Sequence, residues 1–179
     1  MQTNAFLLTT YDNLLGSLDS WLAKAADRPD GDALLTHRLT DDMFPLARQI
    51  RFACNLPGEA MAGAAGVAYS SSDIDDETLI AARERIAATR ALIAGWHSTP
   101  FGADDAPVEL SLANGMTFDL STENYVRDWA LPQFYFHLMS AYAILRAAGV
   151  PLGKADYVGF MFRYLRQPAA DSAGANGGA

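Results

Sequence analysis

Hydrophobic residues recur at helical spacing over most of the chain. Between residues 4 and 26 they follow the i, i+3, i+4, i+7 pattern, which predicts a first helix with one apolar side. The positions on this side are Leu7, Tyr11, Leu14, Leu15, Leu18, Trp21, Leu22 and Ala25. After a turn, residues 32–38 are expected to form one short helical turn that carries His37.

The same spacing predicts two further long helices. The second begins near Asp42, because acidic residues suit the positive end of a helix, and it ends at Ala65 before a glycine. Gln49 is a polar residue on its apolar side, whereas the opposite side is shared by Arg48, Arg51, Asn55 and Glu59. The third helix spans about residues 76–96, and aspartates from the polar connection 67–76 are expected to cap it.

A change of period after the third helix predicts a β-hairpin. Apolar residues alternate with polar ones over 108–112 and again over 116–120. Asn114 and Gly115 lie between the two runs, and this dipeptide is typical of a two-residue type I′ turn.

The fourth long helix is predicted from Ser121 to Gly149. At about 100° per residue, His137 falls on the side opposite Asp128 and Arg146, so its ring should point inward. Pro132 should bend the helix about one turn before His137. Residues 155–166 predict a final short helix, whose apolar side would consist of Tyr157, Phe160, Met161, Tyr164 and Leu165.

Composition limits the class of protein. With 179 residues, half of them apolar, the chain predicts one domain over residues 1–166 and a disordered tail over 167–179. The net charge of −8 argues against a nucleic-acid partner, because there is no basic surplus to neutralise phosphates. A single cysteine excludes an intrachain disulfide, and no apolar run reaches the roughly 18 residues that span a membrane. We therefore expect a cytoplasmic protein with no membrane partner.

Two segments carry a resemblance to a known family. They are DDMFPLARQ at 41–49 and PQFYFHLMSAYAILRAAGVPLGKADYVG at 132–159. Over roughly residues 5–159 the chain resembles an uncharacterised bacterial branch, a domain of unknown function, of the DinB/YfiT-like superfamily of metalloenzymes. The resemblance implies an all-α, up-down-down-up four-helix bundle, here with a small β-hairpin between helices three and four and a short C-terminal helix. It also implies a homodimer.

Superfamily relatives bind a divalent metal through three histidines, and some are thiol-dependent transferases or isomerases. The only imidazoles here are His37, in a connection, His97, at a helix end, and His137, and no two have the HxxxH spacing. Where the branch often has an aspartate, this chain has Asn55, a poorer metal ligand. Cys54 lies on an apolar helix side, so we expect it to be a small buried apolar side chain and not a nucleophile. We therefore expect no bound metal and no cofactor.

Gln49 and His137 are the two polar residues expected inside the bundle, hydrogen-bonded to each other or to another polar group. With Gln133, Tyr125 and Ser140 they would form a small polar ligand-binding site. Three functions stay open: a metal-free, ligand-binding or degenerate member of the superfamily, a metal-assisted thiol-dependent transferase or isomerase using His137, or a dimeric interaction protein without catalysis. No catalytic residue follows from the sequence, so whether the protein is an enzyme stays open.

Overall fold

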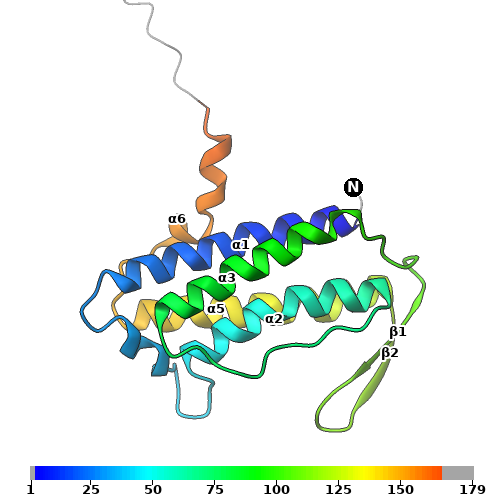
Figure 1. Ribbon diagram of the computed structural model, residues 1–179, viewed down its shortest axis with the longest axis horizontal. Coiled ribbons are helices and arrows are strands. Elements are labelled where there is room, and N and C mark those ends of the chain that lie inside the picture. The colour runs from blue at the N-terminus through cyan, green and yellow to red at the C-terminus, as the bar shows by residue number, and fades with distance from the viewer. Residues whose placement is uncertain (1–2, 167–179) are drawn as a thin grey trace, which may run out of the picture.

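Four long helices form a bundle in the computed structural model, which describes residues 3–166 (Figure 1). They are α1 (Thr3–Ala26), α2 (Leu46–Ala65), α3 (Leu79–Gly95) and α5 (Leu131–Ala147). Helices α1 and α5 run in one direction, and α2 and α3 run in the other, so the predicted up-down-down-up fold is confirmed. The α1–α3 pair lies on one side of the bundle and the α2–α5 pair lies on the opposite side.

Shorter elements link the four helices. They are η1 (Asp32–Thr36), η2 (Trp96–Ser98), β1 (Pro107–Ser111), β2 (Thr117–Ser121), α4 (Thr122–Asn124), η3 (Tyr125–Ala130), α6 (Lys154–Tyr157) and η4 (Gly159–Tyr164). None of the helices in residues 3–166 has the length and apolar character that crossing a bilayer requires. The tail predicted for 167–179 lies outside the described residues.

The apolar side of α1 supplies much of the core. All eight positions predicted for this side are buried, which confirms the helical phase. Tyr11 meets Phe134 of α5 edge to face, with ring centroids 4.8 Å apart. The helix pair across the core is therefore held by large, fully buried side chains.

Two helix starts differ from the prediction. Helix α2 begins at Leu46 rather than near Asp42, because Pro45 adopts an extended backbone (ψ 165°) and a proline disfavours helical geometry in the residue before it. The aspartates at 41 and 42 therefore lie in the preceding loop. Thr78, and not an aspartate, caps α3 by accepting a hydrogen bond from the Ala81 N–H.

The β-hairpin is confirmed, but the predicted turn type is wrong. Strands β1 and β2 pair antiparallel, with Leu110 opposite Phe118. A type I′ turn needs two residues with positive φ, and within the described residues Gly115 (φ 86°) is the only such residue in this loop. The Gly115 N–H donates to the Leu112 carbonyl, and the Leu112 N–H donates to the Met116 carbonyl. The strands are thus joined by a three-residue loop that ends in a glycine bulge.

The predicted fourth helix is one continuous helical stretch with a π-helical segment near its start. The Ser121 hydroxyl caps it by accepting from the Asn124 N–H at 3.1 Å, and Gly149 (φ 84°) follows its end, both as predicted. Residues 125–130, the element η3, form the π-helical turn just before Pro132. Since proline lacks an N–H and its ring crowds the preceding turn, the wider π-helical turn accommodates it.

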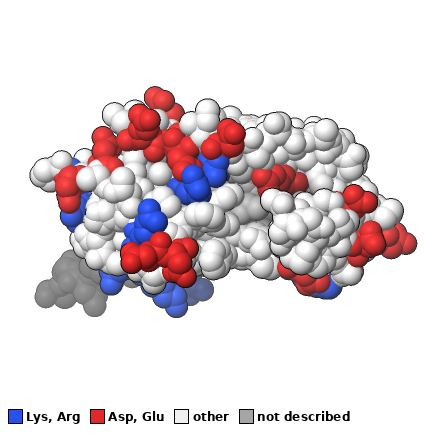
Figure 2. All heavy atoms as spheres, turned by 90° about the horizontal axis from the view of Figure 1, so that it is seen from below, with Lys and Arg blue, Asp and Glu red and all other residues white. Residues whose placement is uncertain are grey.

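A long connection, residues 66–78, joins the parallel helices α2 and α3 by running back along the bundle (Figure 1). It covers the side of α2 that carries Arg51 and Asn55, which are only 8% and 7% exposed. Arg48 and Arg51 each pair with Asp75 of the connection. From below, basic side chains accordingly lie beside acidic ones (Figure 2).

Candidate functional site

His137 lies between α2 and α5, with 8% of its surface exposed. Its Nδ1 atom is 2.8 Å from Oε1 of Gln49, which lies one turn into α2. Both the inward direction and the hydrogen bond to Gln49 are confirmed. The contact joins the two segments that carried the family resemblance.

The hydrogen bonds of Gln49 determine which nitrogen of His137 carries the proton. The Gln49 amide nitrogen donates to the Phe44 carbonyl at 3.2 Å, which directs its oxygen toward the imidazole. Because an amide oxygen only accepts, Nδ1 of His137 must donate, and Nε2 keeps its lone pair. No residue within 3–166 hydrogen-bonds to Nε2, and this atom is not fully buried.

Aromatic rings surround the imidazole. Phe52 of α2 stacks on it with centroids 4.6 Å apart, and Phe136 meets it edge-on at 5.2 Å. This burial lowers the pKa of His137 to about 4, so the ring is neutral at pH 7. Phe136 and Phe44 are themselves 57% and 46% exposed, so the aromatic surroundings of His137 continue to the protein surface.

The other predicted site residues fall in two places. Gln133, half-buried, and Ser140, buried, lie about one turn on either side of His137 along α5. Tyr125 lies elsewhere, because twelve positions of helix separate it from His137, roughly 18 Å at about 1.5 Å per residue. Its hydroxyl donates to the Glu59 carbonyl at 3.2 Å. The structure thus joins Gln49 to His137, places Gln133 and Ser140 on the neighbouring turns of α5, and leaves Tyr125 apart.

Comparison with known proteins agrees with this architecture. The family model described as "Domain of unknown function (DUF1993)" matches residues 5–158. The chain belongs to the DUF1993 family. A crystal structure of a DinB family member protein from Shewanella denitrificans superimposes with a TM-score of 0.74 at 27% identity, covering 94% of this chain and 99% of that one. Among curated proteins, none matches. The DUF1993 chain therefore has the fold of a DinB family member.

The residues of this DUF1993 protein do not fit a three-histidine metal centre. His37 is exposed just after η1, and His97 is exposed in η2 at the end of α3. Residues 3–166 contain no group of three or more His, Cys, Asp or Glu side chains that could hold a metal ion. Burial raises the pKa of the Cys54 thiol to about 12, so this cysteine is no ready thiolate either.

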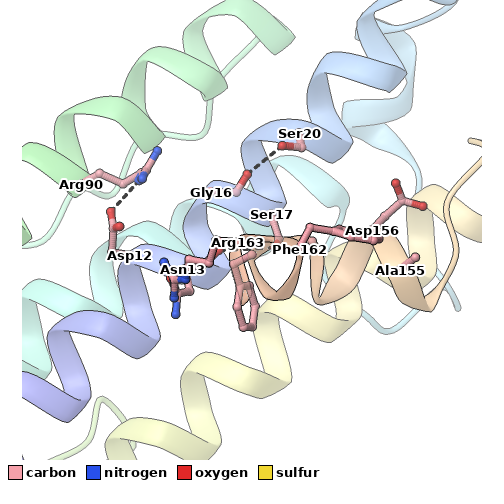
Figure 3. Close-up of a pocket in the computed structure, with 12 residues that line it drawn as sticks. Asp12, Asn13, Gly16, Ser17, Ser20, Arg90, Ala155, Asp156, Phe162 and Arg163 are labelled. Carbon is pink, nitrogen blue, oxygen red and sulfur yellow. Dashed lines mark hydrogen bonds and ion pairs between the residues drawn. The ribbon is translucent and has the colours of Figure 1, made fainter. Parts of the chain in front are cut away.

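Sequence reasoning missed two features of the DUF1993 fold. The first is the stacking of Phe52 on His137, although Phe52 follows Gln49 by three positions and so lies near its side of α2. The second is a cavity of about 480 Å³ between α1, α3 and the C-terminal segment (Figure 3). No sequence signal placed η4 against α1, so this cavity had no basis for prediction.

Proposed function

We propose that this DUF1993 protein is a metal-free bundle that binds a small ligand at His137. The observation that carries the proposal is the fixed, neutral tautomer of His137, which presents the Nε2 lone pair without a partner from residues 3–166. Such a nitrogen accepts a hydrogen bond from a ligand O–H or N–H, and Phe52 and Phe136 offer apolar surface to the ligand body. In this proposal Gln49 orients the imidazole, and Gln133 and Ser140 add polar contacts.

Two matched probes test the site. Phenol carries a hydroxyl donor on an aromatic ring, and anisole is the same ring without the donor. In ¹⁵N NMR of the imidazoles, we expect phenol to shift the Nε2 resonance of His137 in a saturable way and anisole to leave it in place. His37 and His97 are exposed and serve as internal references. Equal effects of the two probes on His137, equal shifts at all three histidines, or no shift with either probe would contradict the proposal.

The C-terminal segment favours a second candidate function, self-association. Met161, Tyr164 and Leu165 are between 52% and 67% exposed, in a C-terminal segment that stands away from the bundle (Figure 1). Exposed apolar clusters of this kind mark interaction surfaces. We infer that the protein is a homodimer that uses this segment. We also propose a cytoplasmic location. It is supported by Cys54, which is a free thiol, because proteins without disulfides are typical of reducing compartments.

A further inference from the structure

A cavity lies on the side of the bundle opposite His137. It has a volume of about 480 Å³, within the range of roughly 300–1,000 Å³ usual for small-molecule sites. Helix α1 forms its floor, Arg90 of α3 lies at one edge, and α6 and η4 form the facing wall (Figure 3). Since α1 and α3 are the helix pair away from α2 and α5, this cavity is separate from the His137 site.

The C-terminal wall of the cavity is anchored to α1 through α6. Trp21 donates its indole N–H to the Asp156 carbonyl at 3.1 Å, and Ser17 donates its hydroxyl to the Tyr157 carbonyl at 3.0 Å. Lys24 adds an ion pair with the Asp156 carboxylate at 2.6 Å. Three side chains of α1 therefore fix the start of this wall before η4 begins.

The charges around the cavity do not balance. Arg90 pairs with Asp12 at 2.7 Å, and Asp156 is already paired with Lys24. Arg163 forms no ion pair with any carboxylate in residues 3–166, and its guanidinium donates instead to the Asn13 side-chain oxygen at 3.0 Å. The cavity is thus left with one uncompensated positive charge, in a chain whose net charge is −8.

Hydrogen-bond donors in the cavity outnumber their partners. Arg90 uses only its Nε atom on Asp12, and its terminal nitrogens lie over Gly16, 3.8 Å from where a Cβ would stand. The Asn13 amide nitrogen has no partner among the described residues. Phe160 and Phe162 add apolar surface to the same cavity. Two guanidinium groups and an amide beside aromatic rings suit an anion with an apolar body.

We propose that this cavity binds a small organic carboxylate that carries an aromatic or branched apolar group. Arg163 supplies the charge that the carboxylate neutralises, and the terminal N–H groups of Arg90 donate to the same group. Phe160 and Phe162 pack against the apolar body.

Calorimetric titration of the full chain with three probes tests the ligand class. Phenylacetate has the proposed charge and body, phenylacetamide has the body without the charge, and inorganic phosphate has charge without the body. We expect saturable binding of phenylacetate, at least about tenfold tighter than that of the other two probes. Phenylacetate that fails to saturate, or that binds no tighter than phenylacetamide or phosphate, would overturn the proposal.

Two substitutions locate the binding, with circular dichroism to show that each variant is folded. Arg163→Gln is expected to weaken phenylacetate at least about tenfold, whereas Arg166→Gln, the same charge change outside the cavity lining, should leave it within about twofold. Asn13→Asp places a carboxylate beside Arg163, so it should abolish binding in a stable fold. Equal affinities of the two arginine variants, or unchanged affinity in a folded Asn13→Asp variant, would refute the site.

Discussion

Two buried tyrosines, Tyr11 and Tyr125, differ in whether the hydroxyl has a hydrogen-bond partner. Tyr125 donates to the Glu59 carbonyl, whereas the hydroxyl of Tyr11, which is fully buried, has no partner among the described residues. Desolvation raises the pKa of both phenols, that of Tyr125 to about 12. A buried polar group without a partner costs free energy, so the two hydroxyls should contribute to stability with opposite sign.

Replacing each tyrosine with phenylalanine tests this difference. We expect Tyr11→Phe to leave the free energy of unfolding unchanged or to raise it by about 1 kcal/mol, because no hydrogen bond is lost. The matched control Tyr125→Phe should lower it by about 1 kcal/mol. Urea denaturation measures both. A loss of more than about 1 kcal/mol in Tyr11→Phe would show that its hydroxyl is hydrogen-bonded in solution, for example to a buried water.

Removal of the His137 ring tests its structural role and the metal question together. His137→Ala leaves a cavity between α2 and α5 and removes the partner of Gln49 Oε1, so stability should fall by about 1–3 kcal/mol. Elemental analysis of untagged protein should give the same metal content before and after the substitution. Stoichiometric zinc or nickel in the wild type, lost in the variant, would restore the metal-assisted alternative.

The lowered pKa of His137 predicts how stability depends on pH. In the unfolded chain a histidine titrates near 6.5, and in the fold His137 titrates near 4. As pH falls from 6.5 toward 4, the unfolded state takes up a proton that the folded state refuses, so stability decreases, by at most about 1.4 kcal/mol per pH unit. Above pH 6.5 the His137 ring is neutral in both states, so its contribution to the free energy of unfolding no longer changes with pH.

Denaturation of wild type and His137→Gln between pH 4.5 and 7.5 measures the pH-dependent contribution of His137 to the free energy of unfolding. The difference in unfolding free energy between the two proteins should shrink with acidification below pH 6.5, because glutamine does not titrate. A difference that is independent of pH would show that His137 titrates normally in the fold.

At the scale of elements, the apolar spacing predicted α1, the hairpin and the inward phase of His137, because each depends on local sequence and a single buried side. The start of α2 was misplaced because the acidic pair at 41–42 gave a stronger signal than the restriction before Pro45. The connection 66–78 covers the side of α2 that carries Arg51 and Asn55, and nothing in the sequence indicated this cover. Such coverage depends on how distant segments meet, which spacing along one helix does not encode.

Asn55 holds that connection with both halves of its amide. It donates to the Ser72 carbonyl at 2.7 Å and accepts from the Ser72 N–H at 3.4 Å. A carboxylate cannot donate, so in Asn55→Asp two oxygens would face each other at a nearly buried position. This pairing gives a structural reason for an amide rather than an acid here.

We therefore expect Asn55→Asp to lower stability by about 2 kcal/mol or more at pH 7, and by more than Asn55→Ala does. At acid pH the protonated carboxyl of the Asn55→Asp variant can donate to the Ser72 carbonyl, so the difference in stability between Asn55→Asp and Asn55→Ala should become smaller. Thermal unfolding of the three proteins at pH 7 and pH 5 measures this. An Asn55→Asp variant as stable as the wild type at pH 7 would indicate that Arg51 turns from Asp75 to the new carboxylate.

At the scale of the whole molecule, the bundle presents different chemistry on its two sides. The α2–α5 side holds a neutral imidazole among aromatic rings, and the α1–α3 side holds a cavity with excess positive charge. Family resemblance predicted the topology and directed attention to His137. It carried no information about the second side, whose cavity depends on where α6 and η4 lie relative to α1.

The exposed segment η4 makes the association state of the molecule testable. We expect sedimentation velocity at tens of micromolar to show a dimer, about the concentration at which a specific interface of ordinary size holds. Tyr164→Glu combined with Leu165→Glu should shift the protein to monomer, and both positions lie outside the cavity lining. As a control for added charge, Ile80→Glu, at an exposed apolar position on α3, should leave the dimer intact. A wild-type monomer under these conditions would exclude the dimer.

The π-helical segment η3 also bears on how this chain tolerates insertions and deletions. A π-helical turn holds one residue more than the α-helical turn it replaces. In a chain one residue shorter between 125 and 130, this stretch would close as ordinary α-helix. Everything before the deletion, the hairpin included, would then keep nearly its present orientation about the helix axis relative to His137, because the shorter α-helical stretch turns through about the same angle. The π-helical turn thus lets the chain lose one residue between 125 and 130 without turning one end of the molecule against the other, whereas a one-residue deletion within α5 would turn it by about 100°.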